Sequence, residues 1–234
     1  MQPEKRHHLF ITGTDTHVGK TYCSAALLSL WRRLGLRPVG LKPIATGSRD
    51  DALCLQEAAG TRIPLSEITP FFFRSPAAPA IAAEAEGQKL TLPEVEARVR
   101  PLLARFSYAV VEGVGGWKTP LTSTETVCDL AVRLQLPVVI VALCRLGVLN
   151  HTLLTVESIR AAGLPSVGIL LNGFSEPSEK TLAETAASLL RHAELPVVSL
   201  REASGLVSRP PDWLLRAVLP PDGGGNGASG RLSS

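Results

Sequence analysis

Short apolar runs rich in β-branched residues alternate with longer segments of helical periodicity along this chain of 234 residues. Six such runs predict strands, at positions 8–12, 38–42, 108–112, 138–143, 167–171 and 197–200. Several of them are apolar throughout instead of alternating with polar residues. That pattern is typical of parallel strands that are covered by helices on both faces.

Helical stripes fill the segments between these runs. One contains Ala26, Leu27, Leu30, Trp31 and Leu34, with two arginines in its last turn and a glycine beyond it at position 35. A second stripe, at positions 153, 156 and 159, ends at a glycine at 163, and further helices are expected over 50–59, 93–105, 126–134 and 177–192.

The alternation of strand and helix predicts an α/β fold, with a doubly wound, mainly parallel sheet flanked by helices. We expect residues 1–219 to form a single domain. The segment 220–234, PPDGGGNGASGRLSS, has almost nothing to bury and is expected to be a disordered, Gly-rich tail.

Composition narrows the class of protein. With 45% hydrophobic and 19% charged residues the chain is globular, and its net charge of +3 is spread along the sequence. Nothing in that balance requires nucleic acid or a membrane as partner, and a small anionic ligand suits it equally well. No apolar stretch is long enough to cross a bilayer or to act as a signal segment, so we expect a cytoplasmic protein.

The four cysteines, at positions 23, 54, 128 and 144, are far apart and form neither C-x-x-C pairs nor a Cys/His cluster. We therefore expect reduced thiols in the core and no structural zinc.

The stretch GTDTHVGKT, at positions 13–21, has the composition of a phosphate-binding loop and lies between a predicted strand and a predicted helix. Gly13 and Gly19 would let the backbone approach an anion, Lys20 would supply a positive charge, and the Thr21 hydroxyl would bind Mg²⁺. Five residues separate the two glycines, where the common motif has four. An ordinary turn with a surface lysine is the weaker alternative.

Other polar residues follow the predicted strands, where parallel sheets bind their ligands. Glu112 ends one strand and precedes glycines at 113, 115 and 116, so its carboxylate suits Mg²⁺. Lys42 ends another strand and points to the same edge. Asp50 and Asp51 begin a predicted helix, where one would cap the helix and the other would reach a metal. A solvated strand end and helix capping are the ordinary explanations for these residues.

Five segments together carry a family resemblance. GTDTHVGKT, LKPIATG, DALCLQ, VEGVGGWKTPL and RLGVLNH occur in the order and approximate spacing of the dethiobiotin synthetases, across positions 9 to about 175. The longer phosphate loop is a feature of that family. The resemblance implies a phosphate-loop NTPase fold and an ATP-dependent reaction in which 7,8-diaminononanoate and CO₂ give dethiobiotin. A carbamate forms first, is phosphorylated to a mixed anhydride, and is closed by the second amine.

The resemblance also implies roles for individual residues. Lys20 and Lys42 match the catalytic lysines, and Thr21, Asp51 and Glu112 match the ligands of Mg²⁺. The positions that match ATP-binding residues are Gly13, Thr14, Asp15, Thr16, His17, Val18, Gly19, Lys20, Thr21, Asp51, Glu112, Gly113, Gly115, Gly116 and Asn172, the last at the adenine edge. The positions that match substrate-binding residues are Thr16, Lys42, Thr46, Gly147, Val148, Leu149 and Asn150. In the family the segment 147–150 comes from the partner subunit, which implies a homodimer.

The chain departs from the family pattern at three places. His17 occupies a loop position where relatives have an acid or glycine, Arg145 replaces a lysine, and Ala78-Pro79-Ala80 stands where relatives often have S-P-H. The arginine keeps the charge but changes its geometry. The third departure affects the expected wall of the diamine pocket.

Three other functions compete with this interpretation. Related phosphate-loop proteins are dimeric ATP-driven switches, but these usually carry a further lysine near the start of the loop, where this chain has Thr14. A GTPase is disfavoured because no N-K-x-D motif is present. An ATP-dependent ligase acting on another amine or carboxylate also remains open.

Overall fold

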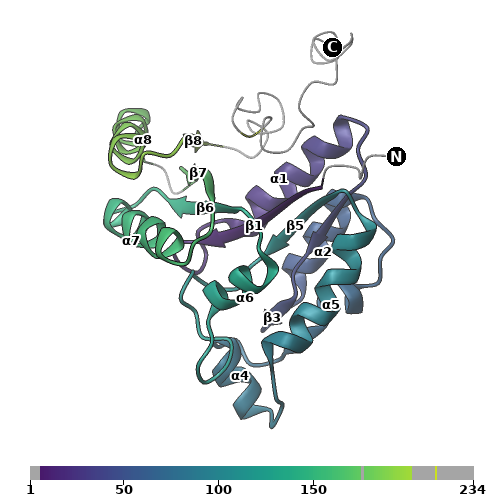
Figure 1. The fold of residues 1–234 in the computed structure, drawn as a ribbon. Coiled ribbons are helices and arrows are strands. Elements are labelled where there is room, and N and C mark those ends of the chain that lie inside the picture. The colour runs from purple at the N-terminus through teal and green to yellow at the C-terminus, as the bar shows by residue number, and fades with distance from the viewer. Residues whose placement is uncertain (1–5, 175–176, 202–213, 215–234) are drawn as a thin grey trace.

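The computed structural model describes residues 6–174, 177–201 and 214 (Figure 1), so the tail predicted at 220–234 lies outside the described residues. Its main sheet has six strands in the order β2-β5-β1-β6-β7-β8. All neighbouring strands in this sheet are parallel. The strands are β1 (His7–Gly13), β2 (Pro38–Leu41), β5 (Tyr108–Glu112), β6 (Val138–Leu143), β7 (Ser166–Asn172) and β8 (Val197–Leu200). The six predicted strands are confirmed, with no end shifted by more than one residue.

Helices cover both faces of the sheet, as the continuous apolar strands require. Within β1, Leu9 and Ile11 pack into the cluster around α1 (Lys20–Arg33), and Phe10 packs into the cluster on the opposite face. The opposite cluster contains side chains of α5 (Leu92–Arg105), α6 (Val127–Leu134), α7 (Val148–Ala161) and α8 (Glu179–Ala193). A strand whose two faces are both buried has no polar face, which explains the missing alternation. The doubly wound α/β prediction is confirmed.

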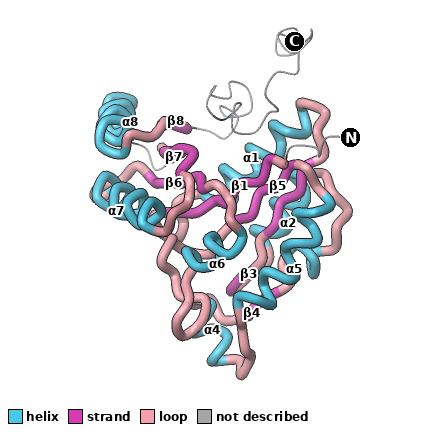
Figure 2. The backbone as a smooth tube through the Cα atoms, in the orientation of Figure 1, coloured by secondary structure: helices cyan, strands magenta, loops and turns pink. Residues whose placement is uncertain are grey.

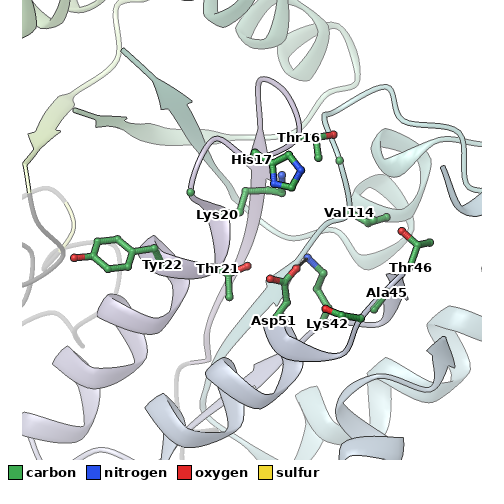
Figure 3. A pocket seen from close by; sticks show the side chains of 13 residues that line it. Thr16, His17, Lys20, Thr21, Tyr22, Lys42, Ala45, Thr46, Asp51 and Val114 are labelled. Carbon is green, nitrogen blue, oxygen red and sulfur yellow. Dashed lines mark ion pairs between the residues drawn. The ribbon is translucent and has the colours of Figure 1, made fainter. Parts of the chain in front are cut away.

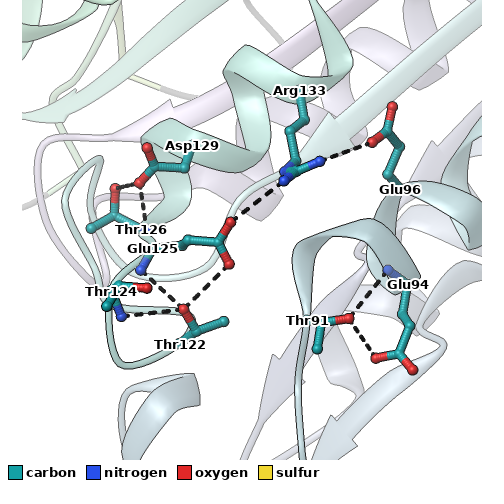
Figure 4. Close-up of polar contacts among 9 residues, drawn as sticks. All are labelled: Thr91, Glu94, Glu96, Thr122, Thr124, Glu125, Thr126, Asp129 and Arg133. Atoms are coloured by element: carbon teal, nitrogen blue, oxygen red, sulfur yellow. Dashed lines mark hydrogen bonds and ion pairs between the residues drawn. The ribbon is translucent and has the colours of Figure 1, made fainter.

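Several helices begin one or two residues away from the predicted start because a capping residue precedes them. Thr91 caps α5 and Ser178 caps α8, each accepting a hydrogen bond from a backbone N–H of the first turn. At α6, Thr126 and Asp129 form a capping box (Figure 4). Arg133, in the last turn of the same helix, forms ion pairs with Glu125 and Glu96. The helix α2 (Asp50–Ala59) matches its prediction, and Leu34 lies just beyond the end of α1.

A small second sheet was not predicted. Strands β3 (Ile44–Thr46) and β4 (Phe71–Phe73) pair in parallel, and the short helices α3 (Leu65–Ile68) and α4 (Pro79–Ala85) belong to the same part of the chain. Figure 2 shows β3 and β4 beside α4, away from the main sheet. Strands of three residues are too short to show a periodic pattern, so sequence periodicity could not identify them.

The expectation for the cysteines is wrong at one position. Cys23, Cys128 and Cys144 are buried free thiols, but Cys54 is exposed on α2. It lies on the outer side of a helix whose inner side is formed by Ala52, Leu55 and Ala59. Among the described residues, no helix is both long enough and apolar enough to cross a membrane.

We expect Thr126→Ala to lower the free energy of unfolding by about 1 kcal/mol, because it removes the hydroxyl that caps α6. Burial alone would raise the pKa of Asp129, but hydrogen bonds from Thr126 outweigh burial, and the net pKa is lowered. The capping box therefore contributes its full stability at pH values above the ordinary aspartate pKa. The penalty should shrink as pH falls through the lowered value. Urea denaturation measures it, with the exposed Thr124→Ala as control, and equal stability of the two variants would contradict the capping role.

Candidate active site

The predicted phosphate loop joins β1 to α1 at the carboxyl edge of the sheet, since β1 ends at Gly13 and α1 begins at Lys20. The Thr14 N–H donates to the carbonyl of Val141 at 3.0 Å, which ties the loop to β6. Gly19 has a φ of 93°, and a Cβ there would lie 2.3 Å from Nδ2 of Asn172. Only glycine satisfies both conditions, so this position is constrained by the backbone and by its neighbour.

Asn172 supports the phosphate loop from behind. Its Nδ2 donates to the carbonyl of Val18 at 2.9 Å, and its Oδ1 accepts from the N–H of Phe174 at 2.9 Å. The residue is only 2% exposed. Its amide therefore connects the end of β7 to the loop, a role that the sequence did not reveal.

Lys20 is buried beneath the loop, and its Nζ donates to the backbone carbonyl of Asp15 at 3.1 Å. Burial and, after it, the nearby charge of Lys42 together lower the pKa of Lys20 to about 8, against the opposing effect of Glu112. A bound anion would offset both effects. The environment thus favours a negatively charged ligand at this ammonium.

A compact polar cluster lies beside Lys20 at the ends of β2 and β5. Nζ of Lys42 is 2.7 Å from Oε1 of Glu112 and 2.7 Å from Oδ2 of Asp51. It also donates to the carbonyl of Gly113 at 3.2 Å, and the Thr21 hydroxyl donates to the same Glu112 oxygen at 2.8 Å. Figure 3 shows Lys42, Asp51 and Thr21 close together at the cavity.

The carboxylates keep Lys42 charged despite its burial. Burial alone would lower the pKa of Lys42, but Glu112 and then Asp51 outweigh it and raise the pKa above the ordinary value. Burial likewise would raise the pKa of Asp51, and Lys42 more than compensates, so this pKa is lowered. The ion pair between them therefore favours the ammonium form of Lys42 and the carboxylate form of Asp51.

The three predicted metal ligands fit Mg²⁺ chemically. Thr21, Asp51 and Glu112 bring one hydroxyl and two carboxylates together, and these hard oxygen donors suit Mg²⁺, which completes its shell with phosphate oxygens and water. Oε2 of Glu112 is buried and makes no hydrogen bond to the described residues, so an acceptor remains for a cation. The described part of the chain holds no cluster of three or more His, Cys, Asp or Glu residues suited to a metal.

A cavity of about 470 Å³ opens over these groups. It brings together Thr16 and His17 of the phosphate loop, Lys42 and Thr46 (Figure 3). The unpredicted strand β3 is what places Thr46 there. Its predicted lining residues are Thr16, His17, Gly19, Lys20, Thr21, Lys42, Thr46, Asp51 and Gly115, and those that the sequence did not indicate are Tyr22, Ala45, Ser48 and Val114.

Other predicted site residues do not line this cavity. Gly116 packs against the backbone of Thr14 and Asp15 and lines a neighbouring cavity of about 520 Å³. The segment at 147–150 begins α7 and lines a third cavity, of about 860 Å³, together with residues of α8. Within one chain, the first cavity and the 147–150 segment are therefore not part of the same hollow.

Comparisons with known proteins show the family of this chain. A family model described as "AAA domain" matches residues 7–203. The ATP-dependent dethiobiotin synthetase BioD of Anaeromyxobacter dehalogenans (strain 2CP-C) is 44% identical over 213 residues, which cover 89% of this chain and 93% of the relative. The chain belongs to the dethiobiotin synthetase family. A second dethiobiotin synthetase, from Anaeromyxobacter sp. (strain Fw109-5), is 43% identical over 78% of this chain and 84% of its own length.

A solved structure supports the fold alone. The cell division protein FtsY of Thermotoga maritima is 15% identical in sequence and superposes with a TM-score of 0.53. The structural alignment covers 94% of this chain and 70% of FtsY. The resemblance to dethiobiotin synthetases and the fold class predicted from the sequence are both confirmed.

We expect Glu112→Gln to lower the free energy of unfolding by about 3 kcal/mol, because the buried ammonium of Lys42 loses its fully buried counter-charge. Urea denaturation without nucleotide measures this loss. Glu125→Gln, which weakens a half-exposed ion pair with Arg133, should cost less than about 1 kcal/mol. Adding Lys42→Met to Glu112→Gln should recover part of the loss, whereas full stability of Glu112→Gln alone would contradict the argument.

Proposed function

We propose that this chain uses ATP to convert 7,8-diaminononanoate and CO₂ into dethiobiotin, with release of ADP and phosphate. One observation carries the proposal. Two buried lysines, Lys20 and Lys42, meet at the phosphate-loop cavity of a chain that is 44% identical to a dethiobiotin synthetase over 89% of its length. ATP is the co-substrate, and the other substrates are small molecules.

The chemistry needs positive charge at two positions. A carbamate oxygen that attacks the γ-phosphoryl group is anionic, and so are the phosphates, so the reactants repel one another until cations hold them together. In our assignment Lys20 contacts the β- and γ-phosphates, and Lys42 contacts the carbamate. The second amine of the substrate then attacks the carbonyl of the mixed anhydride, and phosphate leaves.

Lys42 has to exchange one of its contacts to do this. An ammonium has three hydrogens, and those of Lys42 already meet Glu112, Asp51 and the carbonyl of Gly113. Asp51 is the partner that gives way in our proposal, because its side chain is 47% exposed whereas that of Glu112 is fully buried. Glu112 then keeps Lys42 in place, and the ammonium hydrogen that Asp51 has released donates to the substrate.

We assign Thr21, Asp51 and Glu112 to Mg²⁺. The buried and unpartnered Oε2 of Glu112, together with the all-oxygen donor set, supports this assignment. When bound, the ion neutralises charge on the β- and γ-phosphate oxygens.

Substrate contacts come from two copies of the chain in this proposal. Thr16 and Thr46 line the cavity of one copy and contact the diamine or its carbamate. The Gly147–Asn150 segment of a second copy binds the substrate carboxylate through the N-terminal N–H groups of α7. Support comes from the separate cavity that this segment lines in its own chain, and from Leu146 and Leu149 beside it, which are 102% and 39% exposed. We therefore propose a homodimer with sites at its interface.

Three further expectations remain proposals. Residues 1–219 would form one ATP-binding domain, in line with the family match over 7–203. The protein would be cytoplasmic, where ATP is available. The amide of Asn172 has one hydrogen and one lone pair beyond its two backbone contacts, and these would read the adenine edge.

Phosphate release tests the reaction. Purified protein with ATP, Mg²⁺ and bicarbonate should release phosphate only when 7,8-diaminononanoate is added, and mass spectrometry should identify dethiobiotin. Lys42→Gln should lower kcat by about 100-fold or more, because a charge that stabilises the transition state is lost. Since Lys42 also neutralises Glu112, circular dichroism must show that this variant is folded. ATP turnover that is indifferent to the diamine would instead favour a switch or another ligase.

We expect Asn172→Ala to raise the KM for ATP about tenfold, because buried hydrogen bonds to Val18 and Phe174 are lost. If the amide also reads adenine, the preference for ATP over GTP should narrow. Asn172→Asp is the matched variant, since it keeps the acceptor for Phe174 and loses the donor to Val18. An unchanged nucleotide preference in both variants would remove the adenine role and leave the support of the loop.

A further inference from the structure

The phosphate loop contains an acidic side chain, which is unexpected in a segment assigned to an anion. Asp15 lies between Gly13 and Lys20 in the loop. An unpaired carboxylate there would repel the triphosphate and weaken its binding. The structure therefore has to offset this charge if the loop is to bind ATP well.

Arg145 supplies the offsetting charge. Its Nη2 donates to Oδ2 of Asp15 at 2.6 Å, from a loop 130 residues further along the chain. The other carboxylate oxygen of Asp15 accepts from the N–H of Thr16 at 2.7 Å, and its backbone carbonyl accepts from Nζ of Lys20. Through Asp15, the guanidinium is thus connected to two residues that we assign to the reaction.

Arg145 also belongs to the turn that begins α7. Its carbonyl accepts a hydrogen bond from the N–H of Val148 at 3.0 Å, at the start of the segment that we assign to the substrate carboxylate. The loop that carries it follows β6, and β6 holds the phosphate loop through Val141 and Thr14. The side chain of Arg145 therefore adds a link between two loops that already share a strand.

We propose that Arg145 is a positioning residue that neutralises Asp15 and holds the phosphate loop in the form that binds a nucleoside triphosphate. This inference rests on the proposed function, in which that loop binds ATP. The opposing expectation is that the pair contributes nothing, because both side chains are 49% exposed and surface ion pairs are often worth little. The proposal and this opposing expectation predict different Mg·ATP affinities when the charge of Arg145, or the charges of both Arg145 and Asp15, are removed.

Binding of Mg·ATP without the diamine, measured by isothermal titration calorimetry, distinguishes the positioning role of Arg145 from an ion pair that contributes nothing. Arg145→Gln should weaken binding by about three- to fivefold, because it leaves Asp15 unpaired beside the phosphates. Asp15→Asn combined with Arg145→Gln should bind more tightly than Arg145→Gln alone, since the repelling charge is gone. Arg145→Lys, which restores the charge, should stay close to wild type. The effect should shrink at 0.5 M salt, where exposed charges are screened.

A matched control is available on another surface. Arg100 makes a similarly exposed ion pair with Glu96 at 2.7 Å, and Arg100→Gln should leave ATP binding unchanged. In steady-state kinetics Arg145→Gln should raise the KM for ATP more than it lowers kcat, which a general loss of folding would not produce.

The outcomes separate this inference from the proposed reaction. If Arg145→Gln binds ATP as well as wild type, or if adding Asp15→Asn brings no recovery, the inference is overturned even where dethiobiotin is formed. If the charge pattern holds but no dethiobiotin appears, the reaction is wrong and the role of Arg145 stands. Wild-type protein that failed to bind Mg·ATP would overturn both.

Discussion

The buried ion pair between Lys42 and Glu112 is the interaction on which the site depends. Both side chains are almost inaccessible to solvent, and each would be costly to bury without the other. Their attraction keeps the Lys42 ammonium charged in the interior. Solvent screens this charge only weakly there, so it interacts strongly with charges close to it. Because Glu112 also accepts from Thr21, the same carboxylate places the lysine relative to the phosphate loop. A single acidic residue thus contacts both Lys42 and Thr21, two of the groups to which we assign the reaction.

Strand order explains why these groups meet. β5 lies between β2 and β1, so Glu112 at its end has Lys42 on one side and the phosphate loop on the other. The strands are parallel, and therefore all three ends lie at one edge of the sheet. Helix α1 then starts at this edge with Lys20 and Thr21 in its first turn. Antiparallel pairing of β5 would have moved Glu112 to the far edge, although its sequence would be unchanged.

The sequence predicted what depends on local pattern and composition. Continuous apolar runs identified the strands of the main sheet, and the family resemblance assigned Lys42 and Glu112 to one site, the first as a catalytic lysine and the second as a ligand of Mg²⁺. It did not indicate that the two side chains form an ion pair. Contacts between distant loops left no such signal. Arg145 and Asp15 are 130 positions apart in the sequence, and only the fold brings their side chains into contact. The hydrogen bond from Asn172 to Val18 likewise depends on where the last residue of β7 lies relative to the phosphate loop. Strands β3 and β4 were missed because pairing, not periodicity, defines them.

The arrangement of cavities bears on why a second copy would be needed. Lys20, Lys42 and Asp51 line one cavity, whereas the N-terminus of α7 borders another in the same chain. A substrate with a reacting diamine at one end and a carboxylate at the other needs groups for both ends. In our proposal, residues of one chain provide the first set around Lys42, and α7 of a second copy provides the second set, next to the exposed Leu146 and Leu149. Burying those leucines between two copies would remove apolar surface from water, which would favour such a pairing.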